Sequence, residues 1–267
     1  MLSLKFGQGN AKLSVAISTF SLPAGHSCPF AKECYSKANQ LTGKIIDGQH
    51  CKFRCFAASQ EALYPTVRKA RWHNFNALLS SPSVRSKAEL INNSLPDYNE
   101  KVRVHVSGDF YNEDYFLAWL NVAKNRPNNL FYGYTKALRF LVKYRKITPD
   151  NFRFTASKGG THDLLIEEHN LKYAEVVFSV EEAERKGLEI DHDDSHAIQG
   201  NKSFALLLHG RQPKGTVAGE ALNKLRRLNL GGYSRHKKAK KKLDAIKIFI
   251  FKKGGVKCKK QSLMAAA

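Results

Sequence analysis

The sequence predicts an α/β protein of six βα units, and three observations support that fold class. Short runs rich in Val, Ile and Phe alternate with longer amphipathic stretches, which is the pattern of parallel strands joined by crossover helices. At 267 residues and 42% hydrophobic content, the chain is long enough to bury one sizeable core. No segment reaches the length of a membrane-spanning helix. We therefore expect a βα-repeat domain over residues 1–232, followed by a basic and flexible tail over residues 233–267.

The individual elements follow from the apolar periodicity. Strands are expected at residues 12–20, 102–106, 130–134, 152–156, 174–179 and 203–208. Helices are expected at residues 59–80, 84–93, 113–125, 136–145, 162–169, 181–186 and 217–228. Six such units with right-handed crossovers form either a partial barrel or an open, doubly wound sheet, and periodicity does not separate the two.

Polar residues follow most of the predicted strands. In both arrangements ligands bind at the carboxyl ends of the strands, so these residues are candidates for a site. His209 follows the last strand and belongs to this group. We predict a cofactor-binding role for five others, namely Ser107, Gly108, Asp109, Lys136 and Lys158.

Several of these candidates have simpler interpretations. The Ser107–Asp109 segment is equally consistent with a tight turn before a helix. The glycine-rich run at 157–161 lacks the known phosphate-binding spacings, which favours a flexible turn. The acidic run at 191–196 offers ligands for a divalent ion, yet a solvated loop is the preferred interpretation. His105, inside a predicted strand, is read as a core residue.

Four of the five cysteines lie within 28 residues, in the long loop at 23–57. Cys28 and Cys34 form C-x5-C, and Cys51 and Cys55 form C-x3-C. A chain of the reducing cytoplasm keeps its thiols free, so a metal site is preferred over disulfides. Four thiolates are the ligands of an iron-sulfur cluster, and the sequence favours [4Fe-4S]. Zinc is the less favoured alternative, because structural zinc sites use C-x2-4-C spacing, and unliganded thiols are a third.

The charge of the chain points to a polyanionic partner. Its formal net charge is +21, from 44 Lys and Arg against 23 Asp and Glu. Residues 235–260 hold eleven Lys and one Arg against the single acid Asp244, so they contribute +11 and the rest of the chain +10. We therefore expect binding to DNA or RNA, with a solvated tail as the alternative. A cytoplasmic location, without a membrane partner, follows from the absence of a signal or a spanning segment.

The cysteine loop directly after the first strand of a six-unit βα chain resembles the radical S-adenosylmethionine enzymes. That resemblance implies a partial (βα)6 TIM-like barrel and a three-cysteine [4Fe-4S] site, with S-adenosylmethionine as a possible cofactor. The usual motif is C-x3-C-x2-C. Cys51 and Cys55 match its first part, but Ala58 stands at the third position, so Cys28 or Cys34 would have to complete it.

The chain also resembles a bacteriophage family known as gene product 88. The resemblance is carried by FSLPAG at 20–25, CP at 28–29, CY at 34–35, VHVSGDF at 104–110 and FYGYTK at 131–136. It covers most of residues 12–210 and implies a phage origin, with the host cytoplasm as the location. It also implies an iron-sulfur site without specifying an activity.

The leading hypothesis from the sequence is a phage-type iron-sulfur protein that binds nucleic acid. Its metal ligands are predicted to be Cys28, Cys34, Cys51 and Cys55. One alternative is a radical S-adenosylmethionine-like enzyme that modifies a nucleic-acid base, and another is a zinc-stabilised binding module. Whether the chain is an enzyme stays open, and Cys258 is interpreted as a surface thiol.

Overall fold

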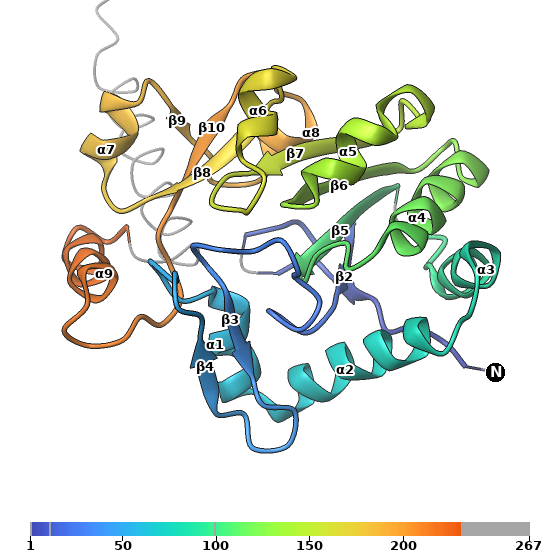
Figure 1. The fold of residues 1–267 in the computed structure, drawn as a ribbon, viewed down its shortest axis with the longest axis horizontal. Coiled ribbons are helices and arrows are strands. Elements are labelled where there is room, and N and C mark those ends of the chain that lie inside the picture. The colour runs from blue at the N-terminus through green and yellow to red at the C-terminus, as the bar shows by residue number, and fades with distance from the viewer. Residues whose placement is uncertain (1, 11, 99, 231–267) are drawn as a thin grey trace, which may run out of the picture.

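The chain folds around one mostly parallel sheet with helices packed against it (Figure 1). This computed structural model describes residues 2–10, 12–98 and 100–230, so the predicted tail at 233–267 and Cys258 lie outside the described residues. The eight strands run in the order β1-β2-β5-β6-β7-β8-β10-β9, and every neighbouring pair is parallel except β1 and β2. The strands are β1 (Gly7–Gln8), β2 (Ile17–Ser21), β5 (Lys101–Ser107), β6 (Leu130–Thr135), β7 (Phe152–Ser157), β8 (Tyr173–Val177), β9 (Glu189–Ile190) and β10 (Phe204–Leu207).

A second, two-stranded sheet forms inside the cysteine loop, where no regular structure was expected. Its antiparallel strands are β3 (Ser36–Ala38) and β4 (Ile45–Asp47). The helices are α1 (Phe56–Leu63), α2 (Pro65–Leu79), α3 (Val84–Ser94), α4 (Glu113–Asn125), α5 (Leu138–Lys143), α6 (Leu164–Glu168), α7 (Val180–Arg185), α8 (Ser195–Ile198) and α9 (Val217–Arg227), with a 3₁₀ turn η1 at Arg145–Ile147.

The α/β class is confirmed, and all six predicted strands are present. They are neighbours in sequence order, β2-β5-β6-β7-β8-β10, without the reversal of order that a doubly wound sheet requires. Within the described residues the edge strands β1 and β9 do not pair with each other, so the sheet is not a closed barrel. The specific six-unit barrel is therefore not established by the strand order alone.

Two predicted elements differ in their bounds for local reasons. The expected first strand begins five residues late, at Ile17, because Ile17 N–H donates to Ser14 O in a turn. The expected helix at 59–80 is two helices, since Pro65 starts α2 and its ring cannot sit inside a helix.

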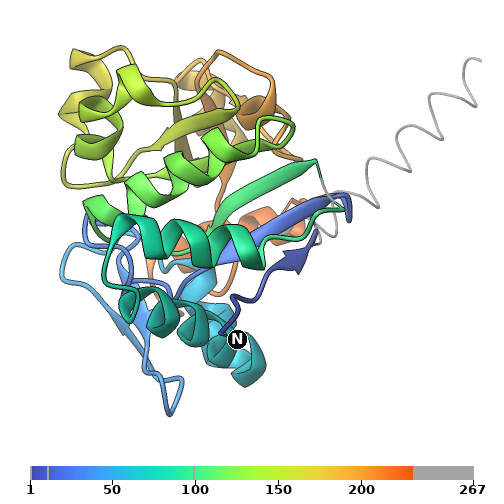
Figure 2. The ribbon, with the colours of Figure 1, turned by 90° about the vertical axis from the view of Figure 1, so that its right-hand side faces the viewer.

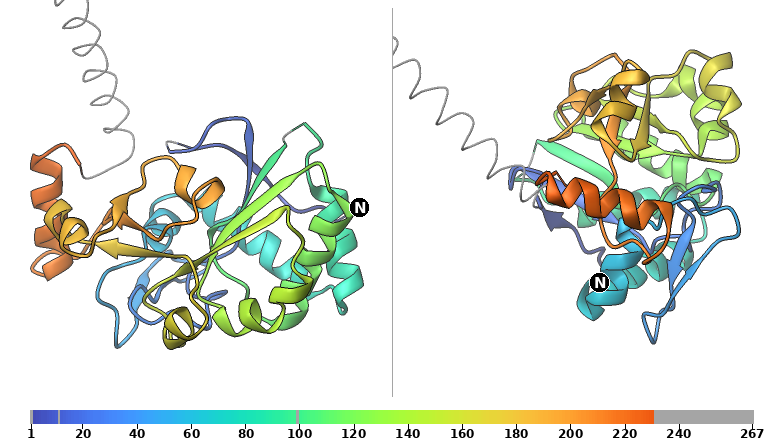
Figure 3. Two further views of the ribbon diagram at one scale, coloured as in Figure 1. Left: turned by 90° about the horizontal axis from the view of Figure 1, so that it is seen from above. Right: turned by 90° about the vertical axis from the view of Figure 1, so that its left-hand side faces the viewer.

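Side chains of successive strand residues alternate between two buried faces. On one face Val102, Val104 and Phe131 join the core beneath α2, α3 and α4, and α3 lies beside α4 (Figure 2). At the other end of the strand order, α9 packs on this outer face against β8 and β10 (Figures 1 and 3). On the opposite face Tyr132 and Phe204 pack against α8. Burial on both faces explains the continuous apolar runs of these strands.

The strand β5 carries an irregularity just before its carboxyl end. His105 has φ +66°, in the left-handed region that non-glycine residues rarely adopt. The register with β2 shifts at this point, from Thr19 opposite Arg103 to Ser21 opposite Ser107. The resulting bulge changes the direction of the strand just before Ser107, and so determines where the residues after β5 lie.

No helix among the described residues has the length and apolar character needed to cross a membrane.

Candidate functional site

Three of the four clustered cysteines line one cavity. Cys28, Cys34 and Cys55 border a space of about 160 Å³ whose other walls come from the sheet. The cavity receives residues from β5, β6, β7, β8 and β10, so these strands curve around it. The sheet residues involved are Arg103, His105, Val106, Ser107, Tyr134, Ser157, Val176 and Leu206.

The three cysteines are held by short loops and a helix end. Cys28 N–H donates to Gly25 O at 3.2 Å, in a turn that Gly25 permits through its φ of +73°. Next to Cys34, Glu33 N–H donates to Gly159 O at 3.0 Å, which joins the cysteine loop to the loop after β7. Cys55 is the N-terminal cap of α1, where the helix dipole favours a thiolate.

The thiols interact electrostatically with one another. Burial raises the pKa of Cys28 well above its usual value, and Asp109 and Cys55 raise it further. Burial followed by the influence of Cys34 raises the pKa of Cys55 to about 12. As free thiols, Cys28 and Cys55 are therefore protonated at neutral pH. Binding of a metal or cluster would release protons, because the ligand form is the thiolate.

Cys51 is placed differently from the other three. It does not line the cavity, and its Sγ donates to Phe53 O at 3.1 Å. Ser36 Oγ, on the hairpin strand β3, lies 3.5 Å from the same sulfur. Cys51 is nevertheless close enough to Cys34 for that thiol to contribute to its raised pKa, after burial and Asp47.

The predicted Ser107–Asp109 segment forms one wall of the cavity. Ser107 Oγ donates to Leu22 O at 2.8 Å, which ties the end of β5 to the start of the cysteine loop. Gly108 has φ +85°, and a Cβ there would lie 2.6 Å from Leu22 Cβ and from Ser27 Oγ. Only glycine allows the two segments to approach this closely.

Asp109 connects this wall to the next strand. Its carboxylate accepts Thr135 Oγ1 at 2.6 Å and the backbone N–H of Lys136 at 2.7 Å. Burial raises the pKa of Asp109 above its usual value, although these hydrogen bonds act in the opposite direction. Asp109 is therefore a structural acceptor that joins the ends of β5 and β6 beside Cys28.

The two predicted lysines separate in the structure. Lys136 lines the cavity, and its Nζ donates to Ser157 O, Ser157 Oγ and Lys158 O at 2.7–2.9 Å. Lys158 does not line the cavity. Its Nζ contacts Glu175 at 3.2 Å and lies 5.2 Å from the centre of the Tyr173 ring.

The glycine-rich run at 157–161 contains no open phosphate cradle. Gly159 and Gly160 donate their N–H groups to the carboxylate of Asp163 at 2.7 and 2.9 Å. An acidic side chain already occupies the position that a phosphate would take. These hydrogen bonds agree with the turn interpretation of this run.

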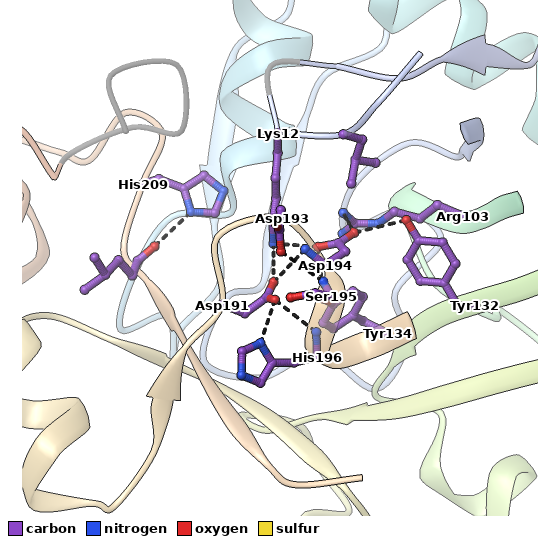
Figure 4. Close-up of polar contacts among 12 residues, drawn as sticks. Lys12, Arg103, Tyr132, Tyr134, Asp191, Asp193, Asp194, Ser195, His196 and His209 are labelled. Carbon is purple, nitrogen blue, oxygen red and sulfur yellow. Dashed lines mark hydrogen bonds and ion pairs between the residues drawn. The ribbon is translucent and has the colours of Figure 1, made fainter. Parts of the chain in front are cut away.

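The acidic run at 191–196 forms an ion-pair network (Figure 4). Lys12 Nζ pairs with Asp191 at 2.8 Å and also with Asp194. Arg103 pairs with the other oxygen of Asp194, and His196 Nδ1 lies 3.0 Å from Asp191. The two buried carboxylates thus have cationic partners within the protein, so the solvated loop expected from the sequence is wrong for Asp191 and Asp194.

Some residues of the cavity were not predicted as site residues. Arg103 and Tyr134 face it from the middle of β5 and β6, and Phe56 faces it from α1. The period of two along β5 could have identified Arg103, because Val102 and Val104 on either side of it are core residues. His209, a candidate from its place after the last strand, does line the cavity, and burial lowers its pKa to about 4.

Across the described ranges, no group of three or more His, Cys, Asp or Glu side chains is arranged to hold a single metal ion. His105 places a buried polar atom at the cavity. Its Nδ1 has no hydrogen-bond partner among the described residues, whereas its Nε2 lies 2.9 Å from the Tyr115 hydroxyl.

Comparisons with known proteins agree with one of the two resemblances. A family model described as Gene product 88 matches residues 2–230. The chain is similar to the Gene 88 protein of Mycobacterium phage L5, with 25% identity over 66% of this chain and 73% of that protein. It is also similar to the Gene 88 protein of Mycobacterium phage D29, with 26% identity over 57% of this chain and 66% of that protein. No solved structure matches the chain, so the likeness to radical S-adenosylmethionine enzymes gains no support.

Proposed function

Because the chain belongs to the Gene product 88 family, whose description names no activity, we propose a function from the site itself: the protein holds a [4Fe-4S] cluster through the thiolates of Cys28, Cys34 and Cys55. The observation that carries this proposal is that these three cysteines border one cavity at the carboxyl ends of the parallel strands. Thiolates are the ligands that iron-sulfur clusters require. A cluster also spaces its ligands further apart than a single ion does.

Three ligands fit the placement of Cys51 better than four. Cys51 Sγ is engaged with Phe53 O and lies outside the cavity lining. A cluster held by the thiolates of Cys28, Cys34 and Cys55 would supply one-electron chemistry and would have room for one ligand that is not a cysteine. The protein's part is to hold the thiolates, keep the cavity narrow and offer polar groups on its walls, among them Asp109 and Lys136.

The strand order supports a partial (βα)6 barrel as the scaffold of this site. The parallel strands β5, β6, β7, β8 and β10 all face one cavity, which is the arrangement of a barrel wall, and the edges of the sheet are left open. In barrels of this kind the site lies at the carboxyl ends of the strands, where the cysteines are found.

A second candidate is a radical S-adenosylmethionine-like enzyme that modifies a nucleic-acid base. Three cysteines beside the Ser107–Asp109 wall favour it over a closed electron-transfer site. The departure from the usual motif at Ala58 remains, since the cavity thiols come from positions 28, 34 and 55.

Nucleic acid is the partner that the charge favours. The net charge of +21 is distributed over both the described residues and the tail. Phosphate contacts made by lysine and arginine weaken steeply as salt rises. Deletion of residues 235–260 is expected to flatten the salt dependence of binding.

The test is the iron, acid-labile sulfide and zinc content of protein purified without oxygen, together with its electron paramagnetic resonance after reduction. Single Cys→Ser variants at positions 28, 34 and 55 are expected to lose the cluster. Cys51→Ser and the matched control Cys258→Ser are expected to keep it. Loss in the Cys51 variant as well would give a four-thiolate site, and zinc alone in the wild type would overturn the proposal.

A further inference from the structure

A larger groove lies next to the cysteine cavity. Its volume is about 690 Å³, within the range of roughly 300–1,000 Å³ usual for ligand sites. It is bounded by β1, β2, one side of α1 and α2, and the inward residues of β5 and β10. Lys5 and Tyr64 are exposed at its edge, while Lys12 and Arg71 are buried in its wall.

The groove is basic but only weakly so. Its lining contains four cations and no Asp or Glu side chain; the cations are Lys5, Lys12, Arg71 and Arg103. Three of the four are paired with carboxylates behind the lining: Lys12 with Asp191 and Asp194, Arg103 with Asp194, and Arg71 with Glu61. Lys5 has no ion pair in the part of the chain that the structure describes. The groove therefore carries about one net positive charge, located at its exposed edge, which suits one or two phosphates better than a dense polyanion.

Aromatic rings accompany this charge. Phe6, Phe56 and Tyr64 line the groove, and Tyr64 is 55% exposed at the junction of α1 and α2. Exposed aromatic rings beside a basic edge are the elements with which proteins bind unpaired bases, because stacking accepts any base and phosphates need a cation. A duplex would keep its bases paired and could not stack on rings inside a groove of this size.

The groove and the cysteine cavity share a partition. Phe56 and His209 line both spaces, and their ring centroids are 4.7 Å apart. Phe56 directly follows Cys55 in sequence. A flat ligand in the groove would therefore rest against the partition whose other side faces the proposed cluster.

We propose that this groove binds unpaired nucleotides of a single-stranded nucleic acid, with Lys5 at a phosphate and Tyr64 stacked on a base. The inference rests on the nucleic-acid part of the proposed function and gives that binding a location and a strand preference. It does not depend on the cluster, so the two can fail separately.

The experiment measures fluorescence anisotropy of labelled DNA and RNA of about 12 nucleotides, a length within the usual single-strand site sizes. The full chain is used, and a duplex of the same sequence is compared with the single strands. Tyr64→Ala is expected to lower the affinity for single strands about 5- to 100-fold, the range that loss of one stacked base gives. Lys5→Glu is expected to lower it and to reduce the salt dependence. The duplex affinity is expected to change little in either variant.

The matched controls are Tyr98→Ala and Lys146→Glu, both exposed and outside the groove lining. Equal losses in the control and groove variants would overturn the groove as the site, as would wild-type affinity in both groove variants. Circular dichroism and urea unfolding like those of the wild type show that Tyr64→Ala and Lys5→Glu are folded, whether or not a cluster is present. Cys55→Ser, which is designed to lack the cluster, should still bind single strands. If wild-type protein binds no nucleic acid while its iron content is high, the groove proposal fails and the cluster proposal stands.

Discussion

The carboxylate of Glu61 pairs with Arg71 Nη1 at 2.8 Å, and the two side chains are 0% and 6% exposed. The same carboxylate oxygen accepts the backbone N–H of Ala24 at 2.9 Å and lies 3.5 Å from Ser107 Oγ. A buried ion pair between α1 and α2 thereby holds the start of the cysteine loop against the end of β5.

Removal of the Glu61 charge is expected to destabilise the protein strongly. Glu61→Gln leaves the Arg71 guanidinium buried without a carboxylate, and losing one partner of a buried pair costs about 3–5 kcal/mol. The measurement is the free energy of unfolding in urea. Glu89→Gln removes the exposed partner of Arg85 and is expected to leave that free energy unchanged. Similar values for the two variants would contradict the role assigned to Glu61.

Substitution of Gly108 tests the close approach of the strand end to the cysteine loop. Gly108→Ala introduces a Cβ within 2.6 Å of Leu22 and Ser27 at a positive φ. The left-handed conformation costs about 1–2 kcal/mol and the overlap about 1–3 kcal/mol more, so a loss of roughly 2–5 kcal/mol is expected. Gly187→Ala is the control, because Gly187 also has a positive φ but no atom lies within 4 Å of the added Cβ. It is expected to show only the backbone part of the loss, and equal losses would refute the contact.

The sequence was sufficient for the order of the elements and for the location of the cysteines. Strands buried on both faces produce apolar runs, and the helices between them produce a period of 3.6, so both are visible without a structure. The hairpin of β3 and β4 was missed because each strand has only three residues, too few to show alternation. That hairpin supplies Ser36, which contacts Cys51. The separate placement of Cys51 was therefore not predictable from spacing.

The ion-pair network was not predictable either, because its partners lie far apart in the chain. Lys12 and Asp191 are separated by 179 positions, and only the fold brings them together. The bulge at His105 also escaped prediction, since no local signal marks a histidine for the left-handed conformation. Lys136 lines the cavity and Lys158 does not. Both lysines have the same predicted role from the sequence because both follow a strand.

The stability of the protein is expected to fall through His196 as pH rises above about 6.5, the pKa of an unperturbed histidine. Burial lowers the pKa of this side chain, but hydrogen bonds with Glu189 and Asp191 outweigh it, so the pKa lies above its usual value. Because the pKa of His196 is higher in the folded protein than in the unfolded chain, its protonation stabilises the fold. This stabilisation is complete at pH values below the unfolded pKa of about 6.5, and it is lost as pH rises through the pKa of the folded state.

The check compares urea unfolding of wild type and His196→Gln between pH 6 and pH 8, values that bracket the unfolded pKa of about 6.5. The stability difference between them is expected to be largest at pH 6 and to shrink toward pH 8. His105 and His209 have lowered pKa values and titrate in the opposite direction at lower pH, but they are unchanged in the variant and cancel in the difference. A difference that does not vary with pH would show that His196 is not charged in the folded protein.

Asp194 gives the sharpest test of the network beneath the groove. It is fully buried at φ +65°, pairs with Lys12 and Arg103, and accepts the Tyr134 hydroxyl at 3.1 Å. Asp194→Asn keeps the shape and the tolerance of asparagine for this backbone conformation but removes the charge. The expected loss is about 3–5 kcal/mol, because Lys12 then pairs with Asp191 alone and Arg103 loses the carboxylate of Asp194.

Asp193→Asn is the matched control for Asp194→Asn, since Asp193 is adjacent and exposed. A surface substitution of this kind is expected to change the free energy of unfolding by no more than about 0.5 kcal/mol. If Asp194→Asn remains folded, the unneutralised charges of Lys12 and Arg103 should also raise its affinity for single strands in the groove that both residues line. A stable variant with unchanged affinity would mean that Asp194 neither holds these cations nor limits the charge of the groove.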